Sequence, residues 1–230
     1  MIAVDGPAGS GKSSAARGVA RALGLRYLDT GATYRALTWW LITNRLDPAS
    51  GRVVAEHARQ PVIEIGTDPA SPVVLVDGAD VSGVIRTREV SNAVSAVASV
   101  PEVRAHLVAM QQEIIALECA AGGGIVAEGR DIGTVVAPQA VVKVFLTASE
   151  DARASRRSAD LAADPAATAA VTRDEHKLRD HADAPQTVMA ADAVEIDTTR
   201  LSLDGVISRI VGLAQQRVRV PPRADAVWTR

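Results

Sequence analysis

Residues 6–13 read Gly-Pro-Ala-Gly-Ser-Gly-Lys-Ser and match the pattern G-x-x-x-x-G-K-[ST]. The apolar run Ile2 to Val4 precedes this loop, and a helical pattern from Lys12 to Leu23 follows it. Glycines let successive backbone N–H groups point at one place, and the start of the helix adds its positive dipole end. A chance glycine turn rarely has both the pattern and this context. The stretch therefore predicts a phosphate-binding loop at a strand–helix junction.

The side chains of the loop predict which phosphates it binds. Lys12 is expected to lie along the β- and γ-oxygens of a nucleoside triphosphate, and the Ser13 hydroxyl to be a ligand of the Mg²⁺ between them. The residues expected to bind the phosphates of ATP are Gly6, Pro7, Ala8, Gly9, Ser10, Gly11, Lys12, Ser13 and Ser14. The loop alone does not separate a kinase from a GTPase switch or an ATPase motor. The sequence contains no Asn-Lys-x-Asp or Thr-Lys-x-Asp guanine motif and no Leu-Ser-Gly-Gly transporter signature, so both alternatives lose support.

Short apolar runs alternate with longer helical patterns, which is typical of strand–helix–strand units and a parallel sheet. The predicted strands are Ile2 to Val4, Ile125 to Ala127, Val141 to Leu146 and Val194 to Ile196. The predicted helices are Lys12 to Leu23, Thr33 to Thr43, Pro101 to Cys119, Ser149 to Leu161 and Ser202 to Arg217. The pattern indicates an α/β fold with three layers.

Three stretches interrupt this alternation. The β-branched runs Val62 to Ile65 and Val73 to Val76 predict a small antiparallel insert, because Asp77-Gly78 after the second run is a strong turn signal. Ser158 to Thr172 is rich in Ala and Asp, contains few large apolar residues and is expected to be an irregular, mobile flap. The tail, residues 221–230, is expected to be loosely held.

Composition excludes several classes of protein. At 230 residues with 47% hydrophobic residues, the chain predicts one domain with appended lobes. A formal net charge of −2 provides no overall field for nucleic acid or an anionic membrane. The single cysteine, Cys119, excludes an intramolecular disulfide and is expected to be a small core residue. With no stretch of about 18 apolar residues, we expect a soluble, cytoplasmic protein. We also expect it to act as a monomer.

Five short motifs stand out along the chain, and four of them contain an arginine. They are Leu28-Asp-Thr-Gly-Ala-x-Tyr-Arg35, Asp80-Val-Ser-Gly-x-Ile-Arg-Thr87, Val94-Ser-Ala-Val-Ala-Ser-Val-Pro-x-Val-Arg104, Glu128-Gly-Arg-Asp-Ile-Gly-Thr134 and Phe145-Leu-Thr-Ala-Ser149. Together with the phosphate loop, they make the chain resemble the bacterial cytidylate kinases over nearly its whole length.

This resemblance implies the P-loop NTPase fold of a nucleoside monophosphate kinase, with a five-stranded parallel core sheet. The core is expected to comprise residues 1–32, 101–148 and 174–220. A monophosphate-binding lobe that contains the small antiparallel sheet would cover residues 33–100, and a short lid residues 149–173.

The resemblance also implies the roles of individual residues. The expected CMP-binding residues are Thr30, Tyr34, Arg35, Ser95, Arg104, Arg130, Asp131, Arg179 and Asp183. Among them, Ser95, Arg104 and Asp131 would read the cytosine, and Asp183 would bind the ribose hydroxyls. Thr30, Arg35, Arg130 and Arg179 would surround the acceptor phosphate. The expected catalytic residues are Lys12, Arg130, Arg153 and Arg157; the last two stand four residues apart and share one face of a helix.

Simple chemistry agrees with this assignment. The second phosphate pKa of a nucleoside monophosphate is about 6, so the attacking oxygen is already largely deprotonated near neutral pH. No general base is required, and arginine, lysine and Mg²⁺ suffice. A carboxylate such as Asp131 accepts from the cytosine amino group, whereas uracil presents an acceptor there. The sequence thus predicts ATP-dependent phosphorylation of CMP, with dCMP as a second acceptor. The alternatives are a kinase for UMP or a coenzyme precursor, and an ATPase that needs no acceptor.

Two positions leave alternatives open. The family usually has an arginine three residues after the ribose-binding aspartate, but this chain has Gln186 there. Either another cation such as Arg86 substitutes for it, or the acceptor is held with one contact fewer. Glu128, after a buried-looking strand, is interpreted either as an indirect partner of Mg²⁺ or as a carboxylate that caps a nearby loop.

Overall fold

The computed structural model describes residues 1–160 and 169–219 and has a parallel sheet at its centre. The sheet has five strands in the order β2-β6-β1-β7-β8. They are β1 (Ile2–Asp5), β2 (Arg26–Asp29), β6 (Ile125–Gly129), β7 (Val142–Thr147) and β8 (Val194–Asp197). The expected parallel core sheet of an α/β fold is confirmed.

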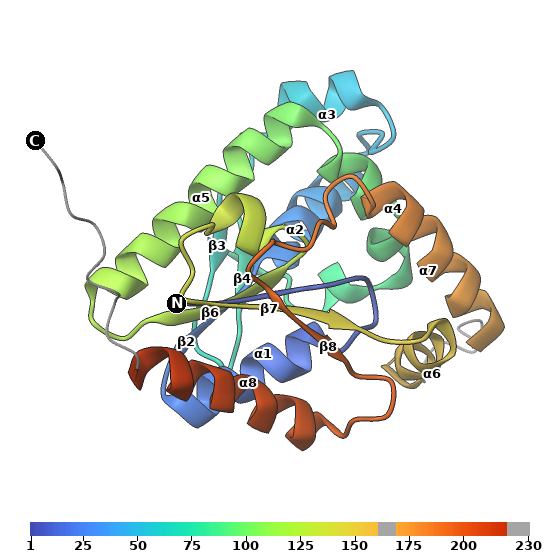
Figure 1. Cartoon of the computed structure of the whole chain (residues 1–230). Coiled ribbons are helices and arrows are strands. Elements are labelled where there is room, and N and C mark those ends of the chain that lie inside the picture. Colours follow the sequence, from blue (N-terminus) through green and yellow to red (C-terminus); the bar gives the residue numbers. More distant parts are fainter. Residues whose placement is uncertain (161–168, 220–230) are drawn as a thin grey trace, which may run out of the picture.

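Helices cover both faces of the sheet and form the outer layers (Figure 1). On one face, α1 (Lys12–Leu23) and α8 (Leu203–Arg219) pack against Ile2 and Val4 of β1. On the other face, Ala3 packs towards α5 (Pro101–Ala120). Successive side chains of a strand point to opposite faces, so a fully apolar β1 must be covered twice. This places the loop after β1 at the carboxyl edge of the sheet.

A lobe inserted between β2 and β6 stands beside this edge. It contains α2 (Thr30–Thr43), α3 (Gly51–His57), β3 (Ile63–Ile65), β4 (Val74–Val76), β5 (Ala79–Asp80), η1 (Val84–Arg86) and α4 (Arg88–Ala98). β3, β4 and β5 form an antiparallel sheet, which confirms the predicted insert. Asp77 and Gly78 join β4 to β5 with φ of 50° and 79°, the left-handed pair that a tight hairpin turn requires.

The remaining elements follow β6 and β7. They are η2 (Ile132–Val136), α6 (Glu150–Asp160) and α7 (Ala169–Asp183). The expectation of an irregular stretch over Ser158 to Thr172 is wrong at both ends, because α6 continues to Asp160 and α7 begins at Ala169. Residues 161–168 of the expected flap and residues 221–230 of the expected tail lie outside the described residues. The mobility of the flap stays a prediction.

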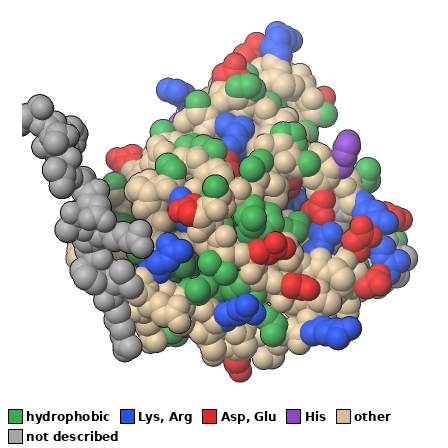
Figure 2. All heavy atoms as spheres, viewed as in Figure 1, with side chains coloured by type: hydrophobic (Ala, Val, Ile, Leu, Met, Phe, Trp, Pro, Cys, Tyr) green, Lys and Arg blue, Asp and Glu red, His purple; other side chains and the backbone are tan. Residues whose placement is uncertain are grey.

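Three further findings qualify the expectations. Cys119 is exposed near the end of α5, so its prediction as a core residue is wrong. Within residues 1–160 and 169–219, no helix is long and apolar enough to cross a membrane. Acidic and basic side chains are interspersed on the face shown in Figure 2, in keeping with the small net charge.

Candidate active site

A cavity of about 820 Å³ opens at the carboxyl edge of the central sheet. The phosphate loop and the lobe form two of its walls, and α7 borders it as well. All nine predicted CMP-binding residues line it: Thr30, Tyr34, Arg35, Ser95, Arg104, Arg130, Asp131, Arg179 and Asp183. The structure therefore brings together residues that lie far apart in the sequence.

The phosphate loop has the backbone that its glycines predict. Gly6, Gly9 and Gly11 have φ of 146°, 73° and 89°. A Cβ on Gly6 would lie 2.2 Å from the carbonyl oxygen of Leu146, so no larger residue fits there. Residues 8–14 of the loop face the cavity. Positive φ values at glycines are what a loop needs if its backbone N–H groups are to converge on a phosphate.

Lys12 lies folded along its own loop. Its Nζ donates to the carbonyl oxygen of Pro7 at 2.7 Å, and the residue is 6% exposed. Burial lowers the pKa of the Lys12 ammonium well below its usual range, and Arg130 lowers it further, while Glu128 and Asp5 oppose the change. A buried ammonium with a carbonyl as its hydrogen-bond acceptor is poised to exchange that carbonyl for a phosphate oxygen, which would favour its charged form.

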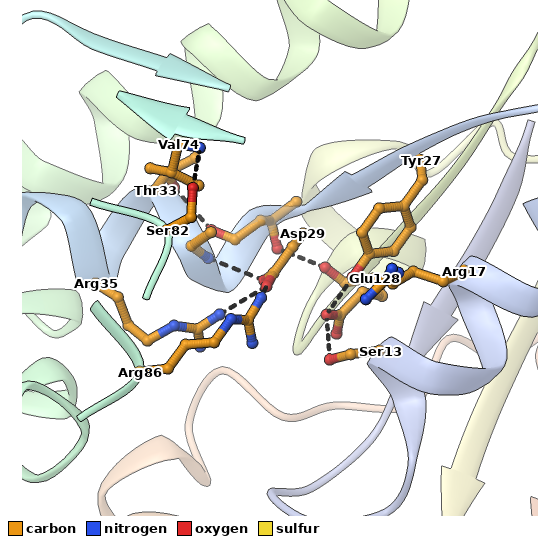
Figure 3. Close-up of polar contacts among 12 residues, drawn as sticks. Ser13, Arg17, Tyr27, Asp29, Thr33, Arg35, Val74, Ser82, Arg86 and Glu128 are labelled. Atoms are coloured by element: carbon orange, nitrogen blue, oxygen red, sulfur yellow. Dashed lines mark hydrogen bonds and ion pairs between the residues drawn. The ribbon is translucent and has the colours of Figure 1, made fainter. Parts of the chain in front are cut away.

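Glu128 lies under the loop, between α1 and β2 (Figure 3). Its Oε1 accepts from the Ser13 hydroxyl at 2.7 Å and from the Tyr27 hydroxyl at 3.3 Å. Burial raises the pKa of the Glu128 carboxyl, and Asp29 adds to this, while Lys12 and Ser13 lower it. Of the two interpretations of this residue, the direct bond to Ser13 favours an indirect partner of a cation.

The donor set at Ser13 fits Mg²⁺. Ser13 provides a hydroxyl oxygen, which is a hard ligand, and the buried Glu128 carboxylate that accepts from this hydroxyl supplies negative charge behind it. Among the described residues, no group of three or more His, Cys, Asp or Glu side chains is placed to hold a metal. In nucleotide sites, Mg²⁺ takes one or two protein oxygens and completes its shell with phosphate oxygens and water. A site with a single hydroxyl ligand and a nearby carboxylate is therefore sufficient.

Asp29 holds two arginines of the lobe at the cavity wall (Figure 3). Its Oδ2 accepts from Arg35 at 2.7 Å and from Arg86 at 2.8 Å, and its Oδ1 accepts from the N–H of Ala32 at 2.9 Å. Burial alone would raise the pKa of Asp29, but Arg35 and Arg86 outweigh burial and lower it. The carboxylate thus fixes two cations where an anionic acceptor group would lie. This role of Asp29 is not among those predicted from the sequence.

The residues expected to read the base also line the cavity. Arg104 forms an ion pair with Asp131. Asp5, at the end of β1, accepts from the N–H groups of Ile132 and Gly133 at 2.8 Å each, and so fixes the turn that follows Asp131. Asp5 is not among the residues predicted from the sequence, although its place immediately before the phosphate loop is a signal.

Ser95, Arg130 and Asp183 form a connected group. The Ser95 hydroxyl donates to Asp183 Oδ1 at 2.7 Å, and Arg130 Nε donates to Asp183 Oδ2 at 3.2 Å. Arg130 Nη1 also donates to the carbonyl oxygen of Gly6 at 3.1 Å, which ties this group to the phosphate loop. Gln186 and Arg86 both line the cavity, and Arg86 lies beside Arg35.

The arginines of α6 differ in where their side chains lie. Arg153 is 7% exposed and donates to the carbonyl oxygen of Ala8 at 3.0 Å and to Asp180. Arg156 donates to the backbone oxygen of Thr198 at 2.6 Å and lines the cavity. The side chain of Arg157 lies outside the described residues, so its expected role stays a prediction.

The family model described as cytidylate kinase matches residues 2–216. The chain belongs to the cytidylate kinase family. The cytidylate kinase of Streptomyces griseus is 51% identical over 219 residues, which cover 94% of this chain and 92% of that protein. The cytidylate kinase of Streptomyces coelicolor is 52% identical over 221 residues, 94% of this chain and 93% of that protein.

A third relative shows the same family in a longer chain. A bifunctional pantoate ligase/cytidylate kinase of Synechococcus is 44% identical over 236 residues, which cover 98% of this chain but 45% of that protein. Family membership and the α/β architecture with a parallel core sheet agree with the P-loop kinase fold expected from the motifs.

Proposed function

We propose that this protein transfers the terminal phosphoryl group of ATP to CMP, with dCMP as a second acceptor. One observation carries the proposal: the phosphate loop and the Arg104–Asp131 pair face the same cavity. Membership of the cytidylate kinase family supports it.

On the donor side, the loop from Gly6 to Ser14 binds the phosphates of ATP. Lys12 leaves the Pro7 carbonyl and follows the β- and γ-oxygens. Ser13, backed by Glu128, would hold Mg²⁺, which supplies charge neutralisation between the two phosphates when bound. Arg130, Arg153 and Arg157 stabilise the negative charge on the transferred group.

On the acceptor side, Asp131 accepts from the cytosine amino group, and Arg104 donates to the ring acceptors. Ser95 assists this pair, and Asp183 binds the ribose hydroxyls. Thr30, Arg35, Arg130 and Arg179 hold the phosphate, beside Tyr34, so that its oxygen faces the donor in line. Because that oxygen is already deprotonated, alignment and charge neutralisation replace a general base.

We also propose the division into a core (1–32, 101–148 and 174–220), a monophosphate-binding lobe (33–100) and a lid (149–173). The lid would close over ATP and exclude water from the transfer. We propose that the protein acts as a monomer in the cytoplasm.

Turnover of ATP with Mg²⁺ against CMP, dCMP, UMP, AMP and GMP tests the function. We expect the largest kcat/KM for CMP, with dCMP next. A larger value for UMP would favour the alternative kinase, and ATP loss that no monophosphate accelerates would favour an acceptor-independent ATPase.

A further inference from the structure

A carboxylate from α7 lies against the phosphate loop. Asp180 Oδ1 accepts from the N–H of Ala8 at 3.3 Å, and Oδ2 accepts from Arg153. Arg153 also donates to the carbonyl oxygen of Ala8 at 3.0 Å. Both peptide groups of Ala8 are thus bound by one ion pair, whose members come from α6 and α7. A backbone N–H of a phosphate loop is a group that normally faces a phosphate oxygen.

The side chain of Arg153 is buried between the phosphate loop and α7. Arg153 is 7% exposed, and among the described residues its Nε is buried without a hydrogen-bond partner. Arg156 and Arg179, by contrast, line the cavity wall. A buried guanidinium with an unmet donor has capacity for a further anion, because it can donate five hydrogen bonds.

The position of Ala8 shows which phosphate would replace the carboxylate. Asp183, one turn along α7 from Asp180, bonds Ser95 of α4 and lines the cavity on the acceptor side. Glu175, on the same helix, bonds Arg88 of α4 at 2.6 Å. The Ala8 N–H therefore faces the helix that adjoins the acceptor site. In a transfer between two nucleotides, the donor phosphate nearest the acceptor is the terminal one.

Two anions cannot share this N–H and this guanidinium at low cost. Like charges at hydrogen-bonding distance repel, and the partly buried site screens this repulsion less than water would. We propose that Asp180 is a positioning residue that holds the Ala8 N–H and Arg153 in place for phosphate and gives both up to the terminal phosphate of the donor. This inference rests on the proposed function in taking ATP as the donor and the Asp183 side of the cavity as the acceptor side.

Equilibrium binding of Mg²⁺-ATP and Mg²⁺-ADP to the wild type and to Asp180→Asn tests the inference. Asparagine keeps the size and one acceptor oxygen for the Ala8 N–H but carries no charge. We expect the Kd for ATP to fall about tenfold, which is about 1.4 kcal/mol. The Kd for ADP, which lacks the terminal phosphate, should stay within about twofold. A merely structural role would weaken both nucleotides together.

Two further variants guard the result. Glu175→Gln removes a different carboxylate of α7, one that accepts from Arg88 and Asn92 of α4. This variant should leave the ratio of the Kd values for ATP and ADP unchanged. Asp180→Ser removes the charge with a smaller side chain and should shift the ratio in the same direction as Asp180→Asn. Weaker ATP binding, or equal shifts for ATP and ADP, in both Asp180 variants would overturn the inference. If the wild type binds neither nucleotide, the proposed donor itself is wrong.

Discussion

The two halves of the cavity are built in different ways. The donor half is one contiguous loop, residues 6–14, and works through backbone N–H groups whose direction the glycines set. The acceptor half consists of side chains from several elements, and most of its charges already have partners within the protein. Arg104 pairs with Asp131, and Arg130 with Asp183. The donor half is thus a general phosphate cradle, whereas the acceptor half must exchange internal hydrogen bonds for those of one particular base.

The largest effect is expected in the donor half. Lys12→Ala should lower kcat by more than about a hundredfold, on the order of 3 kcal/mol or more, because the contact strengthens as charge develops. Thermal unfolding should change little, since burial already lowers the pKa of this ammonium and opposes its charge. Arg21→Ala is the matched control: it removes another cation of α1, which bonds Pro69 at 3.1 Å outside the cavity. If the kcat of Lys12→Ala stays within tenfold of wild type, Lys12 does not have the proposed catalytic role.

The acceptor half should show its effect in specificity. If Asp131 accepts from the cytosine amino group, uracil brings an acceptor against the same carboxylate, and the wild type rejects UMP. A hydrogen bond to a charged group contributes about 1.5–3 kcal/mol, so Asp131→Ala should shrink the CMP to UMP ratio of kcat/KM by about 10- to 150-fold. Asp131→Asn, whose amide donates, should shrink it further. Asp197→Asn, an exposed carboxylate, is the control.

A ratio in Asp131→Ala within about threefold of wild type would mean that Asp131 does not read the base. Arg104 and Ser95 would then carry the preference for cytosine. The comparison between the two halves would change as well, because the Arg104–Asp131 pair would become a structural ion pair.

The same contrast explains what the sequence could predict. The phosphate loop was found because its residues are contiguous and their spacing is imposed by the phosphate. Asp5, Asp29 and Asp180 were missed, because a carboxylate gains its role from groups that only folding brings near. Asp5 bonds residues more than a hundred positions away.

Missed elements have physical causes too. β2 has only four residues and begins with an exposed arginine, so it gives little periodic signal. α4 is rich in Val and Ser, which favour helices weakly, and its apolar face is set by packing on α2 and α5. α7 is strongly polar, and ion pairs and hydrogen bonds to α4 and α6 help to hold it in place. The apolar residues near the end of α5 predict a buried Cys119, but Cys119 is exposed and Leu117, two residues before it, is 65% exposed.

Asp29 offers an intermediate effect on stability with a defined pH dependence. Its folded pKa is lowered by Arg35 and Arg86 against burial, so its ion pairs contribute stability above the unfolded pKa of about 4 and lose it as pH falls through the folded pKa. Asp29→Asn should cost about 2 kcal/mol at pH 7. The difference from wild type should shrink at pH 3, as measured by urea unfolding. A difference that grows on acidification would contradict this sign.

The smallest effect is expected at Gln186, where the family usually has an arginine. Gln186 is half-buried at the cavity, and a half-exposed ion contact contributes about 0.2–1 kcal/mol. If Arg86, fixed beside Arg35 by Asp29, already supplies the missing charge, Gln186→Arg should raise kcat/KM for CMP by less than about fivefold. Arg86→Gln should then lower it by more than Gln186→Arg raises it. Gln186→Leu, which removes the amide without adding charge, is the control. A gain above about tenfold in Gln186→Arg, with little loss in Arg86→Gln, would mean that this chain holds its acceptor with one contact fewer. The acceptor half would then lack one positive charge that the other members of the family use to bind the acceptor phosphate.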